Sequence, residues 1–102
     1  MLTRINDANF REKINNAAAG LLFCYKKLCP YCGTTRAALE KFGSSMPTLT
    51  YLSLDIEENP EAGNALEIER APTMLVIKNG KIERARAGTM RPADIARFYS
   101  GI

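Results

Sequence analysis

Two cysteines three positions apart, in the segment Cys29-Pro30-Tyr31-Cys32, have the spacing of a covalent redox centre. Thiol–disulfide exchange needs a thiolate, because the thiol is a poor nucleophile, and a second thiol close enough to release the mixed disulfide. Pro30 suits the first turn of a helix, and a helix start stabilises negative charge on the first sulfur. The motif therefore predicts Cys29 as the nucleophile and Cys32 as the resolving thiol.

The size of the pKa shift that Cys29 needs is modest. A thiol with a pKa of about 8.5 is about 3% ionised at pH 7, whereas a pKa of about 7 gives about half, a difference of about 2 kcal/mol. A helix terminus supplies about 0.3–1 kcal/mol when exposed and up to about 2 kcal/mol when partly buried. We expect hydrogen bonds to the sulfur, and the charge of Lys26 or Lys27, to supply the rest, and Pro30 and Tyr31 to tune the reduction potential.

Other chemistries are open to a lone C-x-x-C pair. A structural zinc site needs four ligands, and only Cys24 remains in a sequence without histidine. An iron–sulfur or metal-binding module anchored by Cys29 and an inert pair stay as alternatives. Cys24 lies in an apolar run and is expected to be a small core residue. We predict no bound metal or cofactor, only a redox-active Cys29–Cys32 disulfide.

Length and charge limit the class of protein. A chain of 102 residues predicts one domain over residues 1–102. The net charge of +3 is small and its Lys and Arg residues are scattered, which favours a solvated surface over nucleic-acid binding. No apolar run reaches about 18 residues, and residues 1–7 lack an apolar segment of signal-peptide length. We therefore expect a cytoplasmic monomer that does not bind membranes.

Apolar spacing in the first half of the chain predicts alternating strands and helices. Thr3–Asp7 is a short strand or lead-in, and Asn6 or Asp7 caps a helix that Gly20 ends. Leu21–Tyr25 reads as a strand buried on both faces, and a loop over Lys26–Leu28 leads into the cysteine helix, which Gly43 ends.

The second half of the chain continues the alternation. Leu49–Asp55 alternates as a strand does, and Asn59-Pro60-Glu61 opens a helix with Ala62, Ala65, Leu66 and Ile68 inside. Asn79-Gly80 predicts a hairpin between Thr73–Ile77 and Lys81–Ala87. Arg91-Pro92-Ala93-Asp94 starts a last helix whose inner side holds Ile95, Phe98 and Ile102. The expected fold is α/β, with a mixed four- to five-stranded sheet and helices on both faces.

Four features at these spacings together resemble the thioredoxin superfamily over nearly the whole chain. They are Leu21–Tyr25 leading into Cys29–Cys32, Asp55–Pro60, Ala71-Pro72-Thr73, and Lys78–Lys81 with Gly88 beyond. The resemblance implies a thioredoxin fold and a redox carrier that reduces protein disulfides and is restored by a thioredoxin-reductase-type donor.

The resemblance also implies a substrate-binding rim. Pro72 would be cis and close to the sulfurs, and Ala71 would pair through its backbone with an extended substrate, with Gly88 and Thr89 on the same rim. Without the resemblance, Pro72 reads as a strand-entry residue and Gly88 as a strand terminator.

The chain departs from both branches that it resembles. Thioredoxins usually have Trp where Leu28 stands and Gly-Pro where Pro30-Tyr31 stands, and Cys-Pro-Tyr-Cys is the usual glutaredoxin pair. A glutathione-dependent glutaredoxin is therefore an alternative. Glutaredoxins, however, carry a Gly-Gly turn and nearby polar residues for glutathione. In the corresponding region of this chain, residues 82–90, Gly88 is the only glycine and no acidic residue stands in the expected place. We expect poor glutathione recognition.

A further departure affects proton transfer. Thioredoxins usually bury an Asp six positions before the first cysteine, often accompanied by a Lys; here these positions hold Phe23 and Ser53. A buried acid would act as general base for the resolving thiol. Without it, we expect slower release of the mixed disulfide, or a pH optimum above neutral.

Overall fold

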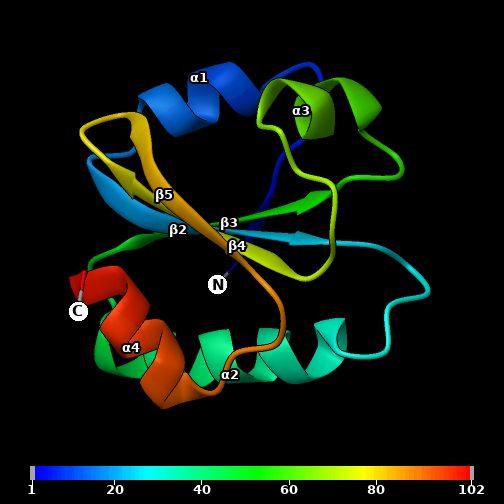
Figure 1. The fold of residues 1–102 in the computed structure, drawn as a ribbon. Coiled ribbons are helices and arrows are strands. Elements are labelled where there is room, and N and C mark those ends of the chain that lie inside the picture. Colours follow the sequence, from blue (N-terminus) through cyan, green and yellow to red (C-terminus); the bar gives the residue numbers. More distant parts are fainter. Residues whose placement is uncertain (1, 102) are drawn as a thin grey trace.

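A five-stranded sheet with two helices on each face makes up the protein (Figure 1). The structure, a computed structural model, describes residues 2–101. The elements follow one another in the predicted order: β1 (Thr3–Arg4), α1 (Phe10–Asn15), β2 (Ala19–Tyr25), α2 (Cys32–Ser45), β3 (Thr50–Asp55), α3 (Pro60–Ala65), β4 (Thr73–Lys78), β5 (Lys81–Ala87) and α4 (Pro92–Ser100). No helix within residues 2–101 is long and apolar enough to cross a membrane.

Strand β2 lies at the centre of the sheet, whose strand order is β1-β3-β2-β4-β5. It pairs in parallel with β3, where Tyr25 is opposite Asp55, and antiparallel with β4, where Cys24 is opposite Thr73. The β1–β3 pair is parallel and the β4–β5 pair antiparallel, so the predicted mixed sheet is confirmed. The loop that carries the cysteines therefore leaves the sheet from its middle.

Alternate side chains of β2 enter two separate cores. Leu22 and Cys24 join the core beneath α1 and α3, and Leu21 and Phe23 join the core beneath α2 and α4. All four side chains are fully buried. Because both faces of the sheet are covered by helices, as Figure 1 shows, β2 is apolar throughout, as its sequence predicted.

The predicted Asn79-Gly80 hairpin joins β4 to β5. Asn79 has φ 54° and Gly80 has φ 75°, the pair of positive angles that defines a type I′ turn. A side chain at residue 80 would also collide with the carbonyl group of Asn15. The hairpin is therefore seated against the end of α1.

The N-cap of α1 is Asn9, which makes no side-chain capping hydrogen bond, so the prediction of Asn6 or Asp7 at that position is wrong; Asn6 instead caps the turn that leads into α1. The Asn6 side-chain oxygen accepts hydrogen bonds from the backbone N–H groups of Ala8 (2.9 Å) and Asn9 (3.0 Å). The Asp7 carboxylate instead accepts from the N–H of Ala62 (2.7 Å) in the first turn of α3. A cap supplied from 55 positions away fixes α1 and α3 side by side on one face of the sheet.

The prediction that Gly20 ends the first helix is wrong. The helix α1 ends at Asn15, and Gly20 lies inside β2, opposite Thr50 of β3. A Cβ atom built at Gly20 would collide with the carbonyl oxygen of Thr50. Glycine is needed here for the close approach of two strands, a reason that a local pattern does not reveal.

Several predicted boundaries and burials differ by a few residues. The helix α2 runs past Gly43 to Ser45, because Gly43 is buried within it. Strand β3 begins at Thr50 and is buried on both faces rather than alternating. In α3, Ala65 is exposed, and Gly63 lies inward against Ile56. The predicted inner residues Ile95 and Phe98 of α4 are buried, and Ile102 lies outside the described residues.

Substituting Gly20→Ala tests the close approach of β2 to β3. The added methyl group must displace the backbone of Thr50, so we expect the free energy of unfolding to fall by about 2–3 kcal/mol. Urea denaturation of the oxidised protein measures the change. The matched control is Gly33→Ala, where an added Cβ meets nothing within 4 Å; its stability should stay unchanged or rise by up to about 1 kcal/mol. Equal stability of the Gly20 variant and the parent would contradict this packing.

Candidate active site

The loop of residues 26–31 projects beyond the sheet and carries the first cysteine (Figure 1, cyan). The helix α2 begins at Cys32, so Cys29 precedes the helix instead of opening it as predicted. The Cys32 N–H donates to the Cys29 carbonyl (3.3 Å), which closes a turn between the two cysteines. Their side chains form a disulfide with an S–S distance of 2.08 Å and a Cα–Cα distance of 5.4 Å. The predicted Cys29–Cys32 disulfide is confirmed.

Exposure distinguishes the two cysteines. Cys32 is 7% exposed and belongs to the core beneath α2 and α4, whereas Cys29 is only partly buried at the edge of that core. The flanking side chains of Leu28 and Tyr31 are 96% and 62% exposed. An incoming group therefore meets Cys29 first, within an exposed apolar surround.

Two stacked aromatic rings, those of Phe23 and Tyr25, form an aromatic floor at the position where the family resemblance would place an acid. Phe23 is fully buried in the same core as Cys32, and its ring stacks on that of Tyr25 with centroids 5.6 Å apart. The guanidinium carbon of Arg36 lies over both rings, 5.3 Å from the centroid of Phe23 and 5.1 Å from that of Tyr25. Such contacts stabilise an arginine by about 0.5–2 kcal/mol.

The two lysines of the loop, Lys26 and Lys27, do not lie over the aromatic rings that contact Arg36. Lys27 Nζ lies 3.4 Å from Glu58 Oε2, with the two side chains 74% and 54% exposed. An exposed pair of this kind contributes at most about 1 kcal/mol to stability, and it draws the Lys27 charge toward a carboxylate. Lys26 is partly buried. That either lysine stabilises a thiolate stays a prediction.

The expected rim residues lie together. The Ala71–Pro72 peptide bond is cis, as the resemblance implied. The Gly88 N–H donates to the Pro72 carbonyl (2.8 Å), and Thr89 follows directly in the chain. Thr89 Oγ1 lies 3.2 Å from Thr35 Oγ1 on α2, one helical turn beyond Cys32. These contacts bring together the residues just before β4, the segment just after β5 and the first turn of α2.

Two residues of this site, Thr35 and Arg36, were missed in the sequence. Thr35 is 1% exposed and its oxygen also accepts from the N–H of Met90 (3.4 Å), so it anchors the rim to α2. Both residues are three or four positions after Cys32, the spacing that places side chains on the same face of a helix as the cysteine. That spacing was the available signal.

Cys24 is the small core residue that its position predicted. It is fully buried in the core on the α1–α3 side of the sheet, and burial raises the pKa of its thiol to about 12. It is therefore separated by the sheet from the disulfide core. Residues 2–101 contain no group of three or more His, Cys, Asp or Glu side chains arranged to hold a metal ion.

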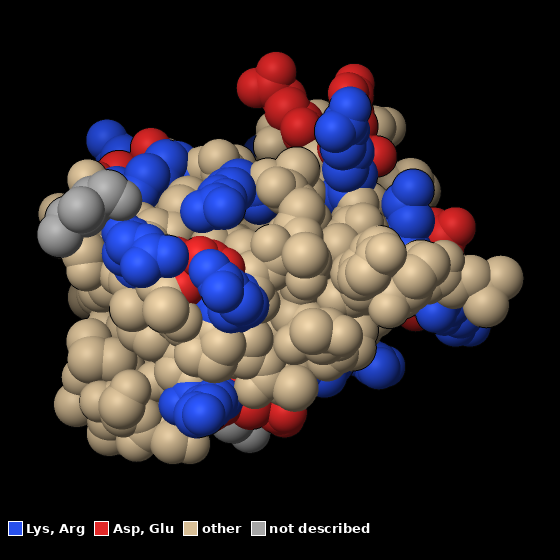
Figure 2. Space-filling view, turned by 60° about the horizontal axis from the view of Figure 1, so that its bottom comes forward, with Lys and Arg blue, Asp and Glu red and all other residues tan. Residues whose placement is uncertain are grey.

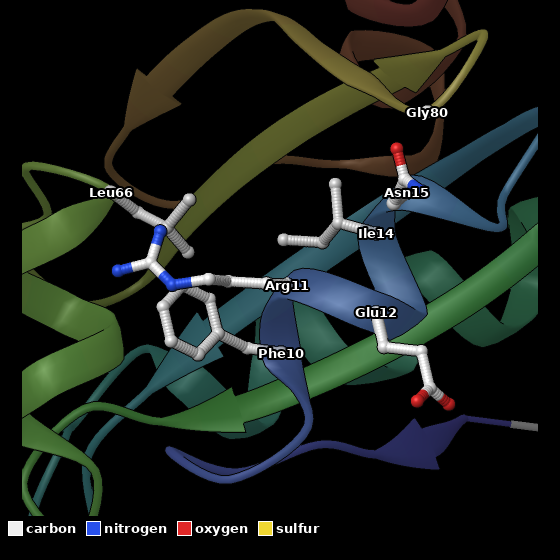
Figure 3. Close-up of a pocket in the computed structure, with 7 residues that line it drawn as sticks. All are labelled: Phe10, Arg11, Glu12, Ile14, Asn15, Leu66 and Gly80. Atoms are coloured by element: carbon white, nitrogen blue, oxygen red, sulfur yellow. The ribbon is translucent and has the colours of Figure 1, made fainter.

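A cavity of about 530 Å³ lies on the face of the sheet opposite the Cys32 core, between α1, α3 and the hairpin (Figure 3). Phe10, Ile14 and Leu66 supply its apolar lining. Arg11 lies across Phe10, with its guanidinium carbon 4.7 Å from the ring centroid. Neither Cys29 nor Cys32 lines this cavity, so it is separate from the disulfide.

Basic side chains do not gather into a single patch on the face shown in Figure 2. They stand apart from one another, and several pair with acids, such as Arg84 with Glu83 (2.7 Å) and Arg97 with Asp94 (2.8 Å). Such spacing is typical of a solvated surface.

Comparison with known proteins agrees with this arrangement. The family model described as "Thioredoxin" matches residues 1–100. The chain belongs to the thioredoxin family. It is a thiol–disulfide oxidoreductase of the thioredoxin type, with Cys29 and Cys32 as its redox pair.

Individual thioredoxins resemble the chain in sequence and in structure. It is 27% identical over 88 residues to the thioredoxin of Chlamydia trachomatis, covering 83% of each chain. It is 32% identical over 71 residues to thioredoxin-1 of Saccharomyces cerevisiae, covering 70% of this chain and 68% of that protein. Among solved structures, desulfothioredoxin of Desulfovibrio vulgaris superposes with a TM-score of 0.86 at 30% identity, covering 98% of this chain and 97% of that chain. Mitochondrial thioredoxin 3 of Saccharomyces cerevisiae in its oxidised form shares the fold, with a TM-score of 0.88 at 20% identity over 99% and 95% of the two chains.

The raised pKa of Cys24 predicts a thiol that does not react in the folded protein. Because its pKa is about 12, the thiolate is scarce at pH 8, and the fully buried sulfur is also out of reach of reagents. We expect the oxidised protein to show no reactive thiol in a colorimetric thiol assay until denaturant is added, and then one per chain. Rapid labelling of the folded, oxidised protein would show that Cys24 is accessible.

Proposed function

We propose that this thioredoxin reduces protein disulfides with Cys29 as the attacking group and Cys32 as the resolving group. The difference in burial between the two cysteines is the observation that supports these roles. The thiolate of Cys29 attacks one substrate sulfur and expels the other as a thiolate, which takes up a proton. Cys32 then loses its proton, its thiolate attacks the Cys29 sulfur, and the second substrate thiolate leaves as the internal disulfide closes.

Substrate binding fits the surface around Cys29. Among residues 2–101, no hydrogen bond occupies the backbone N–H or carbonyl of Ala71. These groups therefore suit an extended substrate segment that adds to the sheet as a strand, with Gly88 and Thr89 beside it. The exposed side chains of Leu28 and Tyr31 offer apolar contacts to the same segment. Pro72 holds the rim through its hydrogen bond with Gly88.

The electron donor that fits this site best is a reductase of the thioredoxin-reductase type. Such a donor recognises the same surface as a protein substrate and needs no pocket. A donor of this type works in a reducing compartment, and we propose that the protein acts in the cytoplasm. The Cys-Pro-Tyr-Cys sequence supports the alternative, a glutaredoxin-type site that is reduced by glutathione.

The assigned roles predict opposite results for the two cysteine variants. Cys29→Ser removes the nucleophile and should abolish the reduction of insulin disulfides. Cys32→Ser keeps the nucleophile but cannot resolve, so it should accumulate mixed disulfides that non-reducing electrophoresis and intact mass reveal. Cys24→Ala, on the far side of the sheet, is the control and should retain activity. Full activity of the Cys29 variant would disprove the assignment.

The two candidate donors are separated by the rate at which the disulfide is reduced again. We expect a thioredoxin reductase with its nicotinamide cofactor to regenerate the dithiol at least about tenfold faster than millimolar glutathione with glutathione reductase. Oxidation of the nicotinamide cofactor, followed at 340 nm with insulin as acceptor, measures both rates. Faster regeneration by glutathione would assign the chain to the alternative.

A further inference from the structure

Arg36 is a cation held against two stacked aromatic rings, on the face of the sheet that also buries Cys32. Its guanidinium carbon lies 5.3 Å and 5.1 Å from the ring centroids of Phe23 and Tyr25, which are themselves stacked. The Arg36 residue is partly buried, and no carboxylate within residues 2–101 forms an ion pair with it. Its positive charge is therefore held in place without a neutralising partner.

The helix geometry brings this charge toward Cys32. Arg36 is four positions after Cys32, and side chains at that spacing have Cβ atoms about 5–6 Å apart on one face of a helix. Helical side chains also lean toward the helix N-terminus, which here is the cysteine turn. Tyr25 ends β2 just before the loop to Cys29, so contact with its ring places the guanidinium at that end of α2.

We propose that Arg36 is a positioning residue that stabilises the thiolate of Cys32 during release of the mixed disulfide. This rests on the proposed role of Cys32 as the resolving thiol. With Phe23 in the floor, no carboxylate at that position can accept the Cys32 proton, so the proton goes to water or hydroxide. The Cys32 thiolate then attacks the Cys29 sulfur, the Cys29–Cys32 bond forms, and the substrate thiolate leaves and is protonated by solvent. The arginine does not take the proton; it lowers the free energy of the anion that remains.

Other charged and titratable side chains lie on the elements that surround this end of α2. The titratable and charged groups on the surrounding elements are Tyr25 on β2, Lys26, Lys27 and Tyr31 in the loop, Glu40 and Lys41 on α2, Tyr51 and Asp55 on β3, Lys78 on β4, Lys81, Glu83, Arg84 and Arg86 on β5, and Arg91, Asp94, Arg97 and Tyr99 at α4.

Most of the charged groups in this set have their own partners. Asp55 Oδ1 accepts from the N–H groups of Glu57 (2.9 Å) and Glu58 (3.1 Å), and Lys27 pairs with Glu58. Asp94 is held by two arginines, and Arg84 donates to the Phe98 carbonyl. Within residues 2–101, Arg36 is the one cation that lies over the rings of Phe23 and Tyr25.

The sign of the effect on pH dependence follows from the charge. A fixed cation favours the thiolate over the thiol, so it lowers the pKa of Cys32 and extends release to lower pH. Removing the cation must therefore move the midpoint of the rate–pH profile upward. Because the thiolate belongs to the reduced state, removal must also make the dithiol a stronger reductant.

The test compares Arg36→Met, Arg36→Lys and a matched control, Arg11→Met. Arg11 also lies over a phenylalanine ring, at 4.7 Å, but on the opposite face of the sheet. The mixed disulfide between Cys29 and a small aromatic thiol is prepared in each variant, and its release is followed by stopped-flow absorbance from pH 5.5 to 9.5. We expect Arg36→Met to raise the midpoint by about one pH unit, or about tenfold in rate at pH 7. Arg36→Lys should restore most of that rate, and Arg11→Met should match the parent.

Two outcomes would overturn the role of Arg36. In the first, Arg36→Met has the same rate–pH profile of release as the parent and the same reduction potential, measured against glutathione. The other is equal slowing in Arg36→Met and Arg36→Lys with no shift of the midpoint, which would make Arg36 a packing residue. Either outcome leaves the roles of Cys29 and Cys32 standing, because the cysteine variants test those separately.

Discussion

Pairing of β2 with a strand on each side is the constraint on which the rest of the structure depends. Hydrogen bonding to β3 and β4 fixes β2 at the centre of the sheet and fixes the point at which its last residue, Tyr25, leaves it. The next elements are a short loop and α2, which returns beneath the same strand (Figure 1). The cysteine turn is therefore held between a central strand and a long helix. A shift of β2 would disturb both cores, and a shift of α2 would disturb the core that buries Cys32.

The alternation of side chains along β2 separates structural from chemical roles. Cys24 and Phe23 are neighbours in sequence, yet they face different cores on opposite sides of the sheet. One thiol becomes inert because burial raises its pKa, whereas the disulfide pair lies at the end of the other core. A shift of one residue in the register of β2 would exchange these positions. The parallel pairing with β3 and the antiparallel pairing with β4 therefore keep Cys24 and Phe23 on their own faces of the sheet.

The aromatic floor of the site differs in charge from the acidic residue that the family resemblance implied at this position. Phe23 and Tyr25 provide a ring surface in place of a carboxylate, and a cation lies on that surface instead of an anion. An acid beneath the turn would help Cys32 to lose its proton; a cation beneath it would favour the thiolate once the proton has left. In the mechanism proposed above, the two arrangements favour the same step in different ways: an acid accepts the Cys32 proton, whereas the cation stabilises the thiolate that remains.

The amino-acid sequence by itself determined the order of strands and helices, the hairpin at Asn79-Gly80 and the position of the redox pair. These depend on local signals: apolar periodicity, a turn that requires two positive φ angles, and cysteines three positions apart. The expectation of a cis Pro72 came from the family resemblance, because an isolated Ala-Pro pair favours trans. Only the tertiary structure decided the role of Gly20, the capping of α3 by Asp7, and the contacts of Thr35 and Arg36. Each of these joins residues from different elements, and no local pattern encodes which backbone or ring will lie opposite a given side chain once the sheet has formed.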